Sequence, residues 1–169
     1  PKVDNFPLII GAENSSGPGS YQGIMDEVRI WNTARTQAQI VANMNSQLTG
    51  SETGLVGYWD MNRSGQGAGL TVDNKCIATG AALNGTTVGT ANTPVFAPAV
   101  AQQKTGSGNA ISFDGVDDHI TTNGYSVPTS GDFSVEFWVN NHSNTGFREF
   151  ISQGASGDAF YIGRSEEHT

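Results

Sequence analysis

Short segments in which apolar residues occupy every second position recur along the chain and predict β-strands. The clearest spans residues 133–139, where four apolar side chains alternate with other residues. This period of two is typical of a strand that buries one face. Within residues 21–31, Ile24, Val28 and Ile30 share one parity, which Asp26 breaks. Further apolar segments lie at 7–11, 54–62, 109–115, 150–152 and 159–162. Short strands between turn-forming residues predict an all-β, antiparallel sandwich.

One segment has a helical period instead. Thr36 and Gln39 have the spacing of a capping box, in which each side chain accepts a hydrogen bond from the other residue's backbone. Ile40, Val41 and Met44 then form a one-sided apolar patch. We therefore expect one short helix over residues 36–44.

Residues 63–105 have a weaker pattern than the segments on either side of them. Residues 65–69 are glycine-rich, and residues 78–93 mix Ala, Thr, Gly and Asn with few apolar residues. Asn84-Gly85 is a strong turn signal. We expect a connector that contains one or two marginal strands.

Composition and charge narrow the range of partners. The 169 residues include 8 Lys+Arg and 16 Asp+Glu, which gives a net charge of −8. Nucleic-acid binding requires clustered basic residues, and anionic membranes attract them, so both partners are excluded. No apolar run approaches the ~18 residues of a membrane span, so we expect no membrane insertion. Cys76 is the single cysteine, which precludes an intrachain disulfide.

The last six residues, 164–169, differ in style from the glycine- and asparagine-rich sequence before them. They match the in-frame translation of a common sequencing-library adapter. We interpret them as read-through that follows a native sequence ending near Gly163, with an ordinary acidic tail as the alternative.

Three acidic residues, Asp114, Asp117 and Asp118, form the tightest carboxylate cluster in the sequence. Their oxygens are the ligand type that Ca²⁺ takes, although the spacing is not that of an EF-hand. The alternative, which we favour, is a tight turn in which aspartates accept hydrogen bonds from backbone amides and Gly115 takes a positive φ.

Tryptophans are candidates for ligand binding because sugar rings stack on aromatic faces. Trp138 lies on the parity opposite to the core-facing residues of its strand, and Trp31 has the parity of Arg29. Trp59 lies in another predicted strand. Packing is the favoured alternative for all three, because large aromatic residues in a sandwich usually contribute to its core.

Three sequence strings together resemble one family. Residues 22–32, QGIMDEVRIWN, resemble the penultimate strand of laminin-G-like, pentraxin-like jelly rolls, which the predicted helix follows as it does in that family. Residues 109–120, NAISFDGVDDHI, resemble the opening strand, and residues 131–139 resemble the next one. The resemblance, to the concanavalin A-like lectin/glucanase superfamily, implies an antiparallel two-sheet jelly roll.

The order of these strings is inverted relative to the family. We therefore expect residues 1–62 to be the C-terminal part of a first module and residues 63–105 a connector. Residues 106–163 are then the N-terminal part of a second module in a tandem array cut at both ends. A circularly permuted single sandwich is the alternative. Because such modules have adjacent termini, the two parts can also close on each other.

The resemblance also implies a calcium site. Pentraxin-like relatives hold Ca²⁺ between an acidic or amide run after the strand that resembles residues 8–11 and an Asp or Asn of a later loop. Glu13 and Asn14 lie at the first position, and Asp158 lies near the second. Solvated loop residues are the alternative, and the tandem interpretation assigns the two parts of the site to different modules.

The sequence predicts no enzymatic activity. Glycanases of this fold carry two carboxylates on one face of a strand. Here Glu136 has Ser134 and Trp138 as same-face neighbours, and Asp26 and Glu27 are adjacent, hence on opposite faces. We expect a non-catalytic, extracellular (secreted or cell-surface) adhesion or recognition module that binds glycans or extracellular proteins. The alternatives are an accessory module of a secreted polysaccharide-degrading enzyme and a structural spacer in a repeat array.

Overall fold

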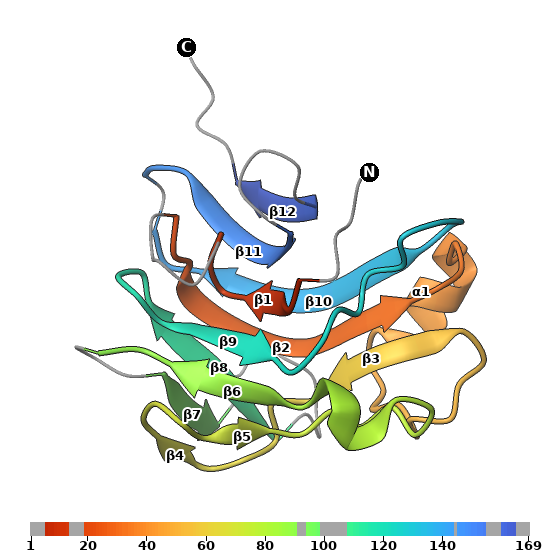
Figure 1. Ribbon diagram of the computed structural model, residues 1–169, viewed down its shortest axis with the longest axis horizontal. Coiled ribbons are helices and arrows are strands. Elements are labelled where there is room, and N and C mark those ends of the chain that lie inside the picture. Colours follow the sequence, from red (N-terminus) through yellow and green to blue (C-terminus); the bar gives the residue numbers. More distant parts are fainter. Residues whose placement is uncertain are drawn as a thin grey trace.

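The computed structural model describes residues 6–13, 19–90, 94–98, 108–143, 145–154 and 160–164. Two curled antiparallel sheets face each other across a shared apolar core (Figure 1). The predicted all-β jelly-roll sandwich is thereby confirmed. Each sheet has six strands.

The first sheet is built from strands that lie far apart in the sequence. In spatial order its strands are β12 (Phe160–Arg164), β11 (Arg148–Gln153), β1 (Leu8–Ile10), β9 (His119–Thr122), β6 (Gly85–Val88) and β5 (Thr71–Val72). β1 therefore pairs on one side with β11 and on the other with β9.

One strand of the second sheet, β2 (Gln22–Trp31), pairs with three others. The main order of this sheet is β10 (Ser134–Asn141), β2, β8 (Asn109–Asp114), β7 (Val95–Pro98) and β4 (Gly65–Gln66). The sixth strand, β3 (Leu55–Trp59), pairs with the second half of β2. β10 is an edge strand on this path, paired with β2 alone.

Strands from residues 1–62 and from residues 106–163 pair directly with each other in both sheets. The expected connector, residues 63–105, contributes β4 to β7, of which β6 and β7 pair with β9 and β8. It is therefore richer in strands than its pattern indicates. Such pairing suits two module parts that close on each other and also a permuted single sandwich, so the division into modules stays a prediction.

A β-bulge in β2 changes the parity that the sequence predicts. Arg29 pairs with Glu136 and Asp26 with Trp138, so two residues of β2 oppose one residue of β10. Glu27, within the bulge, takes a φ of 54°, which is rare outside glycine. Before the bulge it is Met25 that enters the core, and Ile24 is only partly buried. The inward parity predicted for Ile24 is therefore wrong, because the inserted residue reverses the alternation.

The main core lies between the sheets and contains apolar side chains from both. Its largest buried members include Tyr21, Trp59 and Phe113. A second, smaller cluster of Trp31, Leu55, Tyr58 and Cys76 forms apart from it. Ile30 belongs to the main core, and its neighbour Trp31 points to the opposite face of β2, because successive side chains of a strand alternate between faces. The small cluster therefore covers the outer face of β2 and β3.

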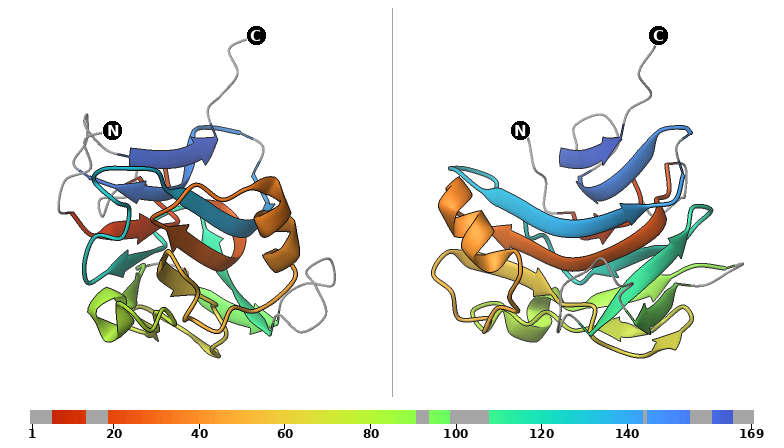
Figure 2. Two further views of the ribbon diagram at one scale, coloured as in Figure 1. Left: turned by 90° about the vertical axis from the view of Figure 1, so that its right-hand side faces the viewer. Right: turned by 180° about the vertical axis from the view of Figure 1, so that it is seen from behind.

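Helix α1 (Gln37–Asn43) confirms the predicted capping box: Thr36 Oγ1 accepts from Gln39 N, and Gln39 Oε1 accepts from Thr36 N. The helix lies beside the ends of β2 and β10 (Figure 2) and has no fully buried residue. Val41, expected in its apolar patch, is 57% exposed. A 3₁₀ helix, η1 (Gly80–Leu83), completes the elements. No helix among the described residues is long and apolar enough to cross a membrane.

Candidate functional site

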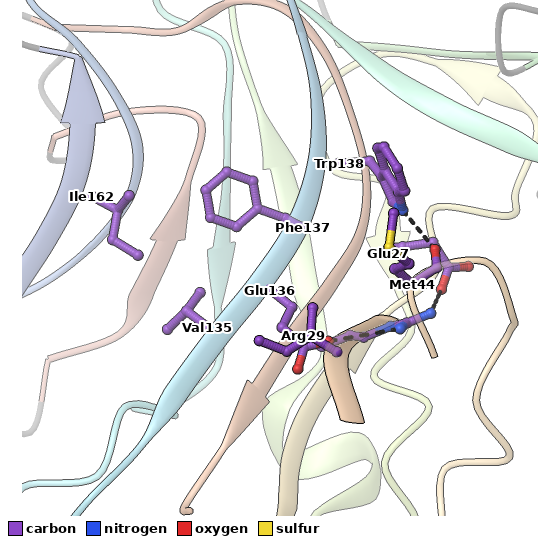
Figure 3. Close-up of a pocket in the computed structure, with 9 residues that line it drawn as sticks. Glu27, Arg29, Met44, Val135, Glu136, Phe137, Trp138 and Ile162 are labelled. Carbon is purple, nitrogen blue, oxygen red and sulfur yellow. Dashed lines mark hydrogen bonds and ion pairs between the residues drawn. The ribbon is translucent and has the colours of Figure 1, made fainter. Parts of the chain in front are cut away.

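A cavity of about 480 Å³ lies at the edge of the second sheet, between β10 and helix α1 (Figure 3). β10 contributes side chains from both of its faces. Glu136 and Trp138 point toward α1, and Val135 and Phe137 point to the other side, where Ile162 lies. The remaining lining residues are Glu27 and Arg29 of β2 together with Ile40 and Met44. The cavity is thus mostly apolar, with charged groups along one wall.

The charged wall is a buried network around Arg29. Its guanidinium lies 2.5 Å from Glu27 Oε2, and the Tyr58 hydroxyl donates to the same carboxylate at 3.0 Å. Two further N–H groups donate to the backbone oxygens of Asn43 and Ser46 at 3.0 and 2.6 Å. Burial and the neighbouring Glu27 raise the pKa of Tyr58, so its hydroxyl remains a donor. Arg29 therefore neutralises a buried carboxylate and fastens the end of α1 to β2.

A second arginine completes the pairing. Arg35 Nε lies 3.5 Å from Glu136 Oε1, and Arg29 Nη1 lies 3.9 Å from Glu136 Oε2. The Arg35 guanidinium also stacks 3.9 Å above the ring of Trp31. The structure thus brings Glu27 and Glu136 to one cavity from neighbouring strands, which their sequence separation concealed. Each of these carboxylates therefore lies next to an arginine.

The three predicted tryptophans have different environments. Trp31 and Trp59 are fully buried, one beneath Arg35 and the other in the main core, where its indole donates to Leu83 O at 3.1 Å. Their faces are therefore covered by protein. Trp138 is partly buried, borders the cavity and donates to Met44 O at 2.9 Å.

Asp26, which breaks the parity of β2, lies in the bulge as a buried carboxyl. Its Oδ1 accepts from the Glu27 backbone N–H at 2.9 Å, and its Oδ2 has no hydrogen-bond partner among the described residues. Burial, with the charge of Glu27, raises the pKa of Asp26 to about 8. The group is therefore largely protonated at neutral pH.

The predicted calcium loop is only partly described. Glu13 is partly exposed, whereas Asn14 and Asp158 lie outside the described residues. The structure adds Glu149 of β11, which the sequence analysis missed. Glu149 is buried, its N–H donates to Gly19 O at 2.9 Å, and its Oε2 has no hydrogen-bond partner within the described chain. Burial and the charge of Glu13 raise the pKa of Glu149 to about 7.

These two carboxylates supply the oxygen ligands that a Ca²⁺ ion takes. An orphaned, buried oxygen on Glu149 beside a second acid fits such an ion. The available sequence signal was a single acidic residue inside a short apolar strand, Phe147 to Ile151. Nothing in the local pattern connects that residue to Glu13, because the electrostatic interaction between them joins segments more than a hundred residues apart.

Asp114, Asp117 and Asp118 meet in the β8–β9 hairpin, with one ligand atom from each within 4.8 Å of the others. Asp114 Oδ1 accepts from Val116 N at 2.8 Å, and Gly115 has a φ of +83°. This is the turn geometry expected from the sequence. Burial raises the pKa of Asp118 to about 7, with a contribution from the other two acids, whereas hydrogen bonds from Thr90 lower the pKa of Asp117.

Comparison with known proteins gives one match. Residues 1–41 match the family model described as the concanavalin A-like lectin/glucanases superfamily. No curated protein and no solved structure matches the chain. The matched segment contains β1, β2 and most of α1, so it includes one strand of each sheet. The match of this segment confirms the predicted resemblance to the concanavalin A-like lectin/glucanase superfamily, and the β-sandwich around it is the fold that the resemblance implies.

Proposed function

We propose that this chain is a non-catalytic recognition module that binds glycans at the cavity beside α1. The observation that carries the proposal is Trp138, a partly buried indole that borders an apolar cavity with charged groups on one wall. Sugars combine an apolar ring face with hydroxyls, so an aromatic surface next to a few polar groups suits them. Arg29 and Glu136, which line the cavity, supply such groups.

The pairing within the cavity supports a binding role over a catalytic one. Retaining and inverting glycosidases need one carboxylic acid that donates a proton and one free carboxylate. Here Glu27 is paired with Arg29, and Glu136 with Arg35. Both acids are therefore held as partners of arginines and fix the wall of the cavity.

The proposed setting is extracellular, at a cell surface or in a secreted protein, where the module mediates adhesion to glycans or extracellular proteins. The family relationship supports this role. Calcium held by Glu13 and the additional Glu149 is part of this proposal, with Asn14 and Asp158 as the further ligands that the resemblance implies. Oxygen-only donors of this kind are suited to Ca²⁺.

A glycan array probed with the whole chain, with calcium and with chelator, tests the proposal. We expect binding by the wild type, a loss of at least tenfold in affinity for Trp138→Ala and a smaller loss for Trp138→Phe, which keeps an aromatic face. Val139→Ala is the matched control, because Val139 is exposed on the same strand and does not line the cavity.

Two outcomes would overturn the proposal. Wild-type binding that Trp138→Ala leaves unchanged would exclude the cavity as the site. Absence of binding to any glycan or extracellular protein, with or without calcium, would favour a structural spacer.

A further inference from the structure

We propose that Asp114, Asp117 and Asp118 form a binding site for a divalent cation, with Ca²⁺ as the best fit, that fastens the β8–β9 hairpin to the segment after β6. The site is separate from the recognition cavity and from the Glu13 loop, and it does not depend on the proposed function. The three aspartates have ligand atoms within 4.8 Å of one another, as one cation requires.

The turn uses only part of the available carboxylate oxygens. Asp114 Oδ1 accepts from Val116 N, and Asp118 Oδ2 accepts from Asp114 N at 3.0 Å. The other oxygens, Asp114 Oδ2 and Asp118 Oδ1, are buried without a hydrogen-bond partner among the described residues. Asp118 is 0% exposed. A turn alone explains one oxygen of each residue and leaves these two unexplained, since a buried polar atom without a partner is costly.

The negative charge of the three aspartates is not balanced by a basic side chain that the structure describes. Within the described part of the chain, no lysine or arginine forms an ion pair with any of the three carboxylates. The neighbouring His119 forms a hydrogen bond through its Nδ1 with the backbone oxygen of Asp117, at 2.9 Å, and not with a carboxylate that the structure describes. A divalent cation would supply the missing positive charge.

The segment after β6 is shaped around the cluster. A Cβ added at Gly89 would overlap Asp118 Oδ1, so a residue without a side chain leaves the space that this carboxylate occupies. The next residue, Thr90, donates from its backbone N–H to Asp117 Oδ2 at 3.0 Å and also from its hydroxyl. Residues 89–90 and the hairpin thus meet at the carboxylates, so a cation there would join them.

The chemistry of the donors selects the class of cation. Three carboxylates without nitrogen or sulfur ligands suit a hard cation, and Ca²⁺ tolerates irregular geometry better than Mg²⁺. The alternative is that a proton, and not a cation, neutralises the buried Asp118 carboxylate. The two alternatives predict opposite responses to metal.

Calcium titration of the metal-free whole chain by calorimetry, with thermal unfolding in parallel, distinguishes them. Glu13→Gln serves as the parent, so that the Glu13 loop does not contribute. We expect this parent to bind one equivalent of Ca²⁺ and to unfold at a higher temperature with it. Adding Asp118→Asn or Asp117→Asn should weaken binding at least tenfold, whereas Asp132→Asn, at an exposed acid, should leave it unchanged.

If Asp118→Asn fails to fold, Asp117→Asn still tests the proposal, because Asp117 is only partly buried and its substitution should disturb the fold less. Gly89→Ala should also weaken binding, since the added methyl group displaces the Asp118 carboxylate. A parent that binds no Ca²⁺, Mg²⁺ or Mn²⁺ overturns the proposal, as does equal binding by the aspartate variants. The glycan array with Trp138→Ala is independent of either result.

Discussion

Buried charges are treated differently in two regions of this molecule. Beside α1, Glu27 lies 2.5 Å from Arg29 and accepts a hydrogen bond from Tyr58. Glu136 Oε1 has no hydrogen-bond partner among the described residues, but it lies 3.5 Å from the guanidinium of Arg35. In the β8–β9 hairpin and at Glu149, buried carboxylate oxygens have no hydrogen-bond partner among the described residues. A paired buried charge belongs to the scaffold, whereas an unpaired one calls for a proton or a ligand.

The largest effect is expected from breaking the paired region. Arg29→Met would leave Glu27 buried without its cation and would remove the donors to Asn43 O and Ser46 O. We expect a loss of about 3–5 kcal/mol in the free energy of unfolding, measured with urea. Lys75→Met is the control, because the Lys75–Asp73 pair is exposed and should contribute less than about 1 kcal/mol. Equal losses for the two variants would contradict the comparison.

Asp26 provides a test by pH. Its pKa is raised from 3.8 to about 8 in the folded state, so between these values the native protein retains a proton that the unfolded chain has released. Stability therefore falls as pH rises through this window, by up to about 1.4 kcal/mol per pH unit for one group. Asp26→Asn should unfold with a shallower pH dependence between pH 5 and 7. Parallel profiles for wild type and variant would show that Asp26 does not titrate as its burial implies.

Substitution of Glu149, whose carboxylate is unpaired, should change the stability of the protein in the opposite direction to substitution of Arg29. In metal-free buffer at pH 8, Glu149→Gln removes an uncompensated charge, and we expect a gain of about 1 kcal/mol in unfolding free energy. Calcium should stabilise the wild type and have a smaller effect on this variant, as measured by thermal unfolding with and without chelator. A destabilised Glu149→Gln in metal-free buffer would assign Glu149 to the scaffold.

The smallest effect is expected at the helix cap above the paired region. Thr36→Ala removes the acceptor for Gln39 N and should cost about 1 kcal/mol. Thr53→Ala, at an exposed position outside the helix, is the control. A cost for Thr36→Ala as large as that for Arg29→Met would mean that capping, and not the buried pair, holds α1 in place.

Local patterns in the sequence predicted the strands, the capping box and the Asp114–Asp118 turn, because each depends on residues close together along the chain. Parity could not predict the burial of Trp31. It places Trp31 on the face of β2 opposite the core but does not reveal that other residues cover that face. The bulge at Glu27 and the electrostatic interaction between Glu13 and Glu149 could not be predicted for a related reason, since both depend on how distant segments of the chain come together.

The position of β1 has a consequence for how the chain folds. This strand lies between β9 and β11, and Leu8 N donates to Thr122 Oγ1 across 114 residues of sequence. Closing such long loops must precede the contacts that stabilise them, which slows folding in β-sandwiches to roughly milliseconds to seconds. A main refolding phase faster than this in stopped-flow fluorescence would contradict the expectation. During synthesis on a ribosome, β1 and the apolar face of β2 would remain exposed to solvent until their partner strands, which lie later in the sequence, have been synthesised.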